Sequence, residues 1–279
     1  MRNEALIGYL LHQRPYQEKR ALYYLFSQQH GVIHGVGKKG APLFMPLQLF
    51  ATGKRDLKTF SQINITSQII AQASIEQVNT EQVNTEQVGA EPSDNVPTIL
   101  AAVPYGNISG QNQYAALYLN EILWRLLPTE DPMPTLWQHY QISLQRLKQP
   151  LNANELRLCL RQFEQYLFTE LGFTPTLTHD NVEDAIESGF TYRFLPDVGF
   201  MPTLQSDPTV RNDEVSEHLG SVTGQTIFSG DDLIEMVALG INEKTLNNWS
   251  KLHRHLMDHL LDYQPLQSRL LWQQQQRYQ

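Results

Sequence analysis

The stretch RPYQEKRALYYLFSQQHGVIHGVGKKG, residues 14–40, decides how the amino-terminal part of the chain folds. Residues 19–27 and 32–36 are rich in aromatic and β-branched side chains, and the turn residues 28–31 separate them. Runs of this kind on either side of a turn are typical of paired β-strands. The stretch also interleaves basic side chains with tyrosines, although the whole chain carries a net charge of −8. It therefore predicts a sheet that carries positive charge.

Three further runs extend these two strands into a small sheet. Residues 4–11 precede them, and residues 47–51 and 57–65 follow after two prolines. Five short strands within about 65 residues predict a closed barrel of the OB type, which is a common platform for oligonucleotides.

Charge is distributed unevenly along the 279 residues. Residues 1–70 carry nine basic and three acidic side chains, whereas residues 71–100 carry five acidic side chains and no basic one. Residues 101–279 hold twelve basic and twenty-one acidic side chains. A basic head on an acidic body indicates a binding site for a polyanion at one end of the chain.

A short repeat follows the predicted barrel. The unit Glu-Gln-Val-Asn-Thr occurs at 76–80 and again at 81–85, and residues 86–88 begin it a third time. A five-residue period fits neither helix nor strand, and the composition is polar and acidic. We interpret 72–97 as a flexible linker. An acidic mimic that folds back on the basic head is the alternative.

The remaining residues predict a mainly helical domain. Apolar side chains recur at helical spacing over 113–127, 136–148, 153–171, 230–239 and 242–264, and a last helix follows Pro265. Asn152 and Glu155 fit a capping box, and residues 190–201 predict a small β-hairpin. The predicted fold class is α+β: a five-stranded OB barrel over 1–71, the linker 72–97, and a helical domain with a hairpin over 98–279.

Reactive groups are sparse in the sequence. Cys159 is the only cysteine, so the chain forms no internal disulfide and no cysteine-based zinc site. His255 and His259 could share a helix face toward a metal, but no third ligand is obvious, and a solvated polar face is the simpler interpretation for both and for His253. The segment 35–40 lacks the spacing of a phosphate-binding loop. We expect no enzyme, no cofactor and no metal site.

The basic head offers the better candidate site. Its cations follow the first, third and fourth strands, where a barrel can bring them together, and aromatic side chains lie among them. Lysine and arginine neutralise phosphates and release counterions, and aromatic rings stack on unpaired bases. The alternative is a core of tyrosines with a solvated basic rim. The predicted nucleic-acid contacts are Arg14, Tyr16, Lys19, Arg20, Tyr24, Lys38, Lys39, Lys54, Arg55 and Lys58.

Six segments in order resemble the RecO family of bacterial recombination mediators. The opening LLHQRPYQEKRALYYLFSQQHGVIHGVGKKG is similar to the family's first strands and basic loop. The segment LYLNEILWRLLP at 117–128 resembles the family's YxNELL helix, and LRQFEQYLFTELGFTP at 160–175 resembles its LRxFExxLLxxLGY helix. The others are YRFLPDVGF at 192–200, FSGDDL at 228–233 and LQSRLL at 266–271.

The resemblance implies an OB-fold followed by a helical domain, without catalysis. It implies binding of single- and double-stranded DNA, annealing of complementary strands, and a RecR partner for loading RecA onto strands coated by single-stranded-DNA-binding protein. It also implies that the acidic C-terminal tail of that coating protein docks on the helical domain. Candidate contacts for the tail are Arg157, Leu160 and Arg161, and the alternative for Arg161 is local pairing with Glu164 or Gln165.

The sequence departs from the family pattern in three ways. The four-cysteine zinc site of many members is absent, since 177–188 has no cysteine. The basic loop is thin after Lys39, and 72–97 and 203–226 have the character of insertions. An OB-fold RNA-binding protein, or an adaptor that acts through its acidic helical domain, are the alternative functions. Without a signal peptide or membrane span, a cytoplasmic, bacterial protein that joins the nucleoid during repair is the expected location.

Overall fold

The computed structural model describes residues 1–66, 107–203 and 226–277. The chain divides by its contacts into two compact units, Met1–Gln149 and Pro150–Gln279. The predicted linker 72–97 lies outside the described residues, as does all but the two ends of the predicted loop 203–226. The domain bounds predicted from these segments therefore stay a prediction.

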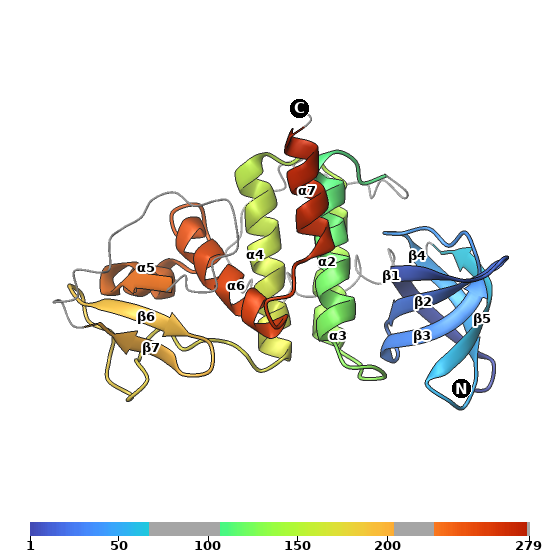
Figure 1. The fold of residues 1–279 in the computed structure, drawn as a ribbon, viewed down its shortest axis with the longest axis horizontal. Helices are drawn as coiled ribbons and strands as arrows, with labels where there is room; N and C mark the ends of the chain where they lie inside the picture. The colour runs from blue at the N-terminus through green and yellow to red at the C-terminus, as the bar shows by residue number, and fades with distance from the viewer. Residues whose placement is uncertain (67–106, 204–225, 278–279) are drawn as a thin grey trace, which may run out of the picture. The chain divides into compact units, whose positions relative to one another are not determined.

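The first unit contains the predicted five-stranded barrel, which closes in the order β1-β2-β3-β5-β4 (Figure 1). β3 and β5 are parallel and the other neighbours are antiparallel. The OB-type barrel is confirmed. The strands are β1 (Glu4–Gln17), β2 (Arg20–Ser27), β3 (Gly31–Lys38), β4 (Pro46–Thr52) and β5 (Leu57–Ile65). β1 runs six residues further than predicted, so Arg14 and Tyr16 lie on a strand and not in a turn.

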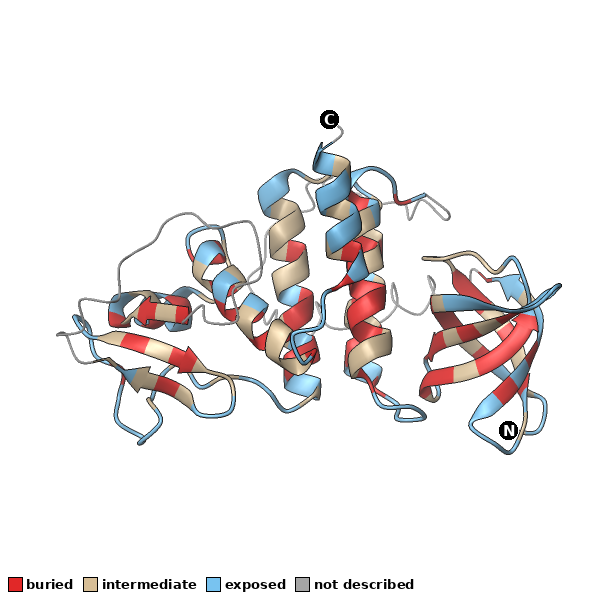
Figure 2. Cartoon of the chain, in the orientation of Figure 1, coloured by how far each residue is buried: buried red, intermediate tan, exposed pale blue. Residues whose placement is uncertain are grey.

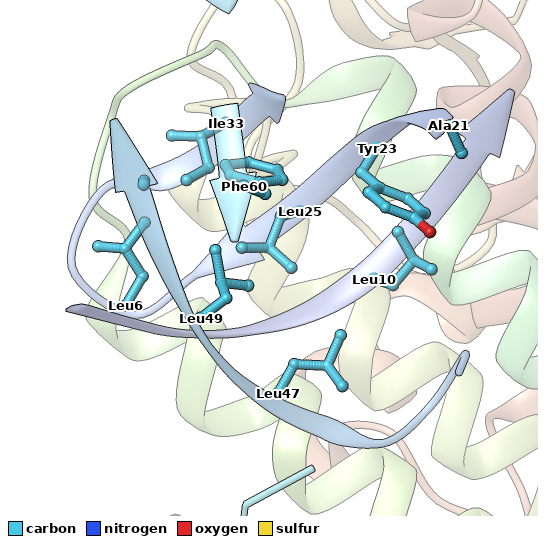
Figure 3. Close-up of a cluster of buried hydrophobic side chains, with 10 residues drawn as sticks. Leu6, Leu10, Ala21, Tyr23, Leu25, Ile33, Leu47, Leu49 and Phe60 are labelled. Carbon is cyan, nitrogen blue, oxygen red and sulfur yellow. The ribbon is translucent and has the colours of Figure 1, made fainter. Parts of the chain in front are cut away.

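The barrel interior is filled by alternate residues of the strands (Figure 3). Buried and exposed positions alternate in the first half of β5, as a strand with one inward face requires (Figure 2). Gly35 is required at its position, because a Cβ there would lie 2.5 Å from the ring of Phe60. The side chains that meet inside are Leu6, Leu10, Ala21, Tyr23, Leu25, Ile33, Leu47, Leu49, Ala51 and Phe60.

Two helices, α2 (Gln111–Leu126) and α3 (Pro134–Leu147), complete the first unit. They cover one end of the outer barrel surface. The ring of Tyr9 on β1 lies 5.3 Å from the rings of both Trp137 and Tyr140 on α3, and Phe26 on β2 packs against the same two rings. These contacts bury Tyr9 and Phe26, whose side chains point outward from the barrel.

The second unit combines four helices with a three-stranded sheet in its described residues. The predicted hairpin is present as β6 and β7, and β8 pairs with the other edge of β6. This third strand was not predicted, because it is only four residues long and far from the hairpin in sequence. The elements are α4 (Ala153–Glu170), β6 (Thr191–Leu195), β7 (Gly199–Pro202), β8 (Thr226–Ser229), α5 (Gly230–Leu239), α6 (Leu246–Leu260) and α7 (Gln267–Arg277).

Helix ends follow the sequence signals with one exception. Asn152 and Glu155 form the predicted capping box at the start of α4. The predicted start of α6 at Asn242 is wrong, because the Asn242 side chain accepts the amides of Lys244 and Thr245 and closes a turn ahead of the helix. Tyr263, an apolar residue near the end of the predicted helical stretch 242–264, lies beyond α6 and is 58% exposed. None of the helices in the described ranges has the length and hydropathy to cross a membrane.

Candidate nucleic-acid interface

The outer face of β1, β2 and β3 carries side chains in rows that run across the three strands. Strand alternation places Tyr23 and Leu25 inside the barrel, so Tyr24 points outward. The row nearest to α3 is buried, the second is aromatic, and the fourth is polar and basic. In order from α3 the rows are Tyr9–Phe26–Val32, His12–Tyr24–His34, Arg14–Leu22–Val36 and Gln17–Arg20–Lys38.

The second row and one residue of α2 form a continuous patch of rings, which we call the aromatic row: His12, Tyr24, His34 and Trp124. The imidazole of His12 stacks on Trp124 with 4.9 Å between ring centres and 16° between planes. Tyr24 lies 5.5 Å from His12 and 4.4 Å from His34. All four rings are partly exposed, so the patch can receive a flat ligand.

Arg14 covers one edge of the aromatic row. Its guanidinium carbon lies 5.7 Å from the ring centres of both Tyr24 and Trp124, which is within cation–π range. Its Nε donates a hydrogen bond of 3.4 Å to Nε2 of His12. This contact requires an unprotonated Nε2 on His12 and so favours the neutral imidazole.

Both histidines of the row are held in the neutral state. Burial lowers the pKa of His12, the neighbouring Arg14 lowers it further, and Glu121 acts in the opposite direction. Burial likewise lowers the pKa of His34, against a smaller effect of Asp56. At neutral pH the row therefore offers uncharged rings for stacking, and the positive charge comes from the residues around it.

Exposed cations flank the aromatic row on two sides. Arg20 and Lys38 face each other across β2 and β3 in the fourth row, and Lys19 lies in the adjacent turn. Lys54 and Arg55 lie in the β4–β5 turn, next to His34, because His34 pairs with Leu57. The loops after the first and fourth strands border the ligand face of OB-folds. Within the described ranges none of these five cations has a carboxylate partner.

A groove continues from the cations at the end of β3. A cavity of about 530 Å³ opens beside Lys38 and Lys39, with Phe60, Gln62 and Asn64 of β5 on its other side. Nζ of Lys39 donates to the backbone carbonyl of Glu18 at 2.8 Å and remains exposed. Beyond Lys38, the groove adds one further cation, Lys39, and the amide groups of Gln62 and Asn64 to the same end of the barrel.

Two predicted contacts lie apart from this face. Lys58 is 5% exposed, and its ammonium is 2.6 Å from the carboxylate of Glu130 and donates to the carbonyl of Arg55 at 2.7 Å. Its charge is therefore used within the fold, which weighs against the predicted nucleic-acid contact. The sequence does not reveal that Lys58 is buried while the next residue, Thr59, is exposed. Tyr16 is 53% exposed near the end of β1, away from the aromatic row.

The predicted tail-binding residues of α4 are engaged within the second unit. Arg157 donates to the side chains of Asn247 and Ser250 at 2.8 and 3.2 Å. Arg161 is 13% exposed and donates to Glu164 at 2.5 Å, which is the local pairing that the sequence left open. Leu160 is half-buried.

Glu164 also binds His253 of α6, and this buried pair was not foreseen. Both side chains are 0% exposed, and their contact is 3.0 Å. The expectation of a solvated His253 is wrong, because α6 turns this ring toward Phe168 and Trp249. Burial lowers the pKa of His253, and Glu164 opposes that effect only in part. Among the described residues, no three His, Cys, Asp or Glu side chains are grouped as a metal ion would need.

Sequence reasoning missed three members of the aromatic row: His12, His34 and Trp124. Strand alternation gives a signal for His34, because this residue directly follows the inward Ile33 and therefore points outward. No local signal identifies Trp124, since its place depends on how α2 packs on the barrel.

Comparison with known proteins agrees with this architecture. The profile of the family described as "Recombination protein O C terminal" matches residues 109–269. The chain is 33% identical to a protein named DNA repair protein RecO from Pseudomonas paraeruginosa, with 72% of each chain covered. The protein of that name from Pseudoalteromonas atlantica is 26% identical, with 98% of this chain and 96% of the relative covered. The chain therefore belongs to the RecO family.

Proposed function

We propose that this protein is a mediator of DNA repair and homologous recombination, and that the outer face of its barrel binds single-stranded DNA. The observation that carries the proposal is the aromatic row between two groups of unpaired cations. Membership of the RecO family supports the cellular role, and the relatives are named as DNA repair proteins.

The physical basis is stacking combined with counterion release. Each base that stacks on an aromatic side chain contributes about 1–3 kcal/mol, whatever the base. Each phosphate neutralised by Arg20, Lys38, Lys54 or Arg55 releases condensed counterions and makes binding depend on salt. Unpaired bases fit a row of neutral rings, whereas a duplex hides its bases from such a row, so we place double-stranded DNA on the cations alone.

We base the detailed role that we propose on membership of the RecO family. The protein anneals complementary strands and, with RecR, helps to load RecA onto strands coated by single-stranded-DNA-binding protein, without catalysis of its own. The acidic tail of the coating protein is the partner of the second unit. Arg157 and Arg161 can bind that tail only by giving up their internal hydrogen bonds, and this competition weakens their assignment to it. We place this activity in the bacterial cytoplasm, at the nucleoid during repair.

Annealing of complementary DNA strands, with and without single-stranded-DNA-binding protein, tests the role. Tyr24→Ala should slow annealing and weaken binding of oligo-dT by about 1–3 kcal/mol. Tyr263→Ala, which removes a more exposed tyrosine from the second unit, is the control. Equal activity of the two folded variants would contradict the proposed surface.

The same measurements separate the alternative functions. Tighter binding of RNA than of DNA of matched sequence would favour the RNA-binding alternative. Full annealing after loss of DNA binding by the barrel would favour an adaptor that acts through the helical unit.

A further inference from the structure

β1 reverses the direction of its side chains midway along the strand. Leu6 and Leu10 point into the barrel, so simple alternation would send His12 and Arg14 inside as well. Leu10 pairs with Leu25 and His12 pairs with Tyr24, which leaves the intervening residue without a partner on β2. One extra residue in a strand is a β-bulge, and it moves the following side chains to the opposite face.

This bulge is what creates the outward row. His12 pairs with the outward Tyr24 only because of the extra residue at Leu11. Arg14, two residues further, is carried outward with it and reaches the faces of Tyr24 and Trp124. Without the bulge the face would lose both its imidazole on β1 and the guanidinium beside it.

Asn120 of α2 holds the bulge from the outside. Its side-chain amide nitrogen donates to the carbonyls of Leu10 and Leu11, both at 3.1 Å. The hydroxyl of Tyr140 donates to the amide oxygen of Asn120 at 2.5 Å. This third bond fixes the orientation of the amide, because its oxygen faces α3 and its nitrogen must face the strand. Asn120 is 1% exposed, so water does not compete for these bonds.

The same helix supplies the ring that stacks on His12. Asn120 and Trp124 are four residues apart, so they lie on one face of α2. Asn120 therefore fixes the backbone of β1 at the bulge, and Trp124 stacks on His12, which the bulge turns outward.

We infer that Asn120 is a positioning residue for DNA binding: by clamping the two carbonyls of the bulge, it sets His12 and Arg14 into the aromatic row. The importance of this role for DNA rests on the proposed function. The geometric part of the inference can be judged without DNA.

Asn112 provides a matched control on the same helix. It is also buried, and its amide also donates to two backbone carbonyls, those of Leu147 and Gln149, at 2.9 and 2.8 Å. These carbonyls lie at the end of α3 and not on β1. Asn112→Ala thus removes the same chemistry as Asn120→Ala without touching the bulge.

The first readout is the indole NMR signal of Trp124, assigned with Trp124→Phe, followed through the pH titration of His12. Asn112→Ala should leave this titration unchanged, and Asn120→Ala should abolish or displace it. The second readout is oligo-dT binding, which should be about tenfold weaker in Asn120→Ala than in Asn112→Ala if one stacking contact is lost. An unchanged Trp124 titration in Asn120→Ala overturns the inference.

Two safeguards keep the result decisive. If Asn120→Ala does not fold, Tyr140→Phe removes only the hydroxyl that orients the amide, and it should shift the Trp124 titration in the same direction by less; no shift overturns the inference. If the unaltered protein fails to bind oligo-dT, the proposed function is wrong, while the indole titration still decides whether Asn120 positions His12.

Discussion

The lysines and arginines of the barrel and the arginines of α4 carry the same charge, but their side chains differ in what they contact. Arg20, Lys38 and Lys54 are exposed, and in the described part of the chain none of them meets a carboxylate. Arg161 is nearly buried against Glu164, and Arg157 is hydrogen-bonded to α6. A cation whose charge is used inside the fold stabilises the fold, and a cation left unpaired at the surface is free to bind an external anion.

The two units therefore differ in where positive charge is available: it is exposed on the barrel, whereas in α4 it is bonded within the unit. In the proposed function, the exposed cations of the barrel attract a polyanion with exposed bases to the neutral rings between them. In the second unit, Arg157 bonds directly to α6, and Arg161 pairs with the glutamate that contacts His253 of α6. The following predictions test this division, beginning with the largest effect.

Arg161→Ala should destabilise the second unit. It removes the cationic partner of the buried carboxylate of Glu164, and removal of one partner of a buried ion pair costs about 3–5 kcal/mol. Chemical denaturation, with hydrogen exchange of the α4 and α6 amides, measures the loss. Arg157→Ala is the control and should cost about 1 kcal/mol, because its partners are neutral. If Arg161→Ala is stable but binds the acidic tail peptide less tightly, Arg161 binds the tail and is not needed for the stability of the second unit.

Reversing the charge of Lys38, Lys39, Lys54 and Arg55 to Glu should weaken binding of single-stranded DNA by roughly a hundredfold, about 2.7 kcal/mol. The salt dependence should also flatten, because about four fewer counterions are released. Fluorescence anisotropy at several salt concentrations measures both. Reversal of Lys244 and Arg254, exposed cations of the second unit, should have little effect. If only net charge matters, the two reversals should cost about half as much binding free energy as the four, because they change the net charge half as much.

Lys58→Ala sharpens the comparison within the barrel itself. The ammonium of Lys58 lowers the pKa of Glu130 by hydrogen bonding and satisfies the carbonyl of Arg55. Its loss should lower the free energy of unfolding by about 1–3 kcal/mol and leave DNA affinity of the folded protein nearly unchanged. Lys54 is exposed and four residues away. Lys54→Ala should leave the melting temperature nearly unchanged and weaken DNA binding, as thermal melts and binding titrations can show.

Acid should weaken the second unit through His253. Burial lowers the pKa of His253 below its ordinary value of 6.5, so the unfolded chain takes up this proton at a higher pH than the folded chain. The free energy of unfolding therefore falls as pH drops below 6.5, by up to about 1.4 kcal/mol at about pH 5.5. Hydrogen exchange of α6 as a function of pH measures this, and His253→Gln should remove part of the dependence.

Local sequence patterns were sufficient to predict the features that depend on a few neighbouring residues. Alternating strands, the capping box at Asn152 and Glu155, and the excess of basic residues in the head are each visible over a few residues. The burial of Lys58 and of His253 was not predicted, because burial depends on which elements pack together. The aromatic row was found only at Tyr24, since the bulge at Leu11 and the approach of Trp124 are set by tertiary contacts with α2.

Photo-crosslinking of oligo-dT that carries 5-iodouracil, followed by mass spectrometry of the linked peptides, tests the central claim most directly. Excited iodouracil reacts with aromatic rings that stack on it. The account predicts crosslinks to Tyr24 or Trp124 on the outer face of the barrel, reduced in the protein with reversed charges at Lys38, Lys39, Lys54 and Arg55. Crosslinks confined to residues 150–279 would contradict it.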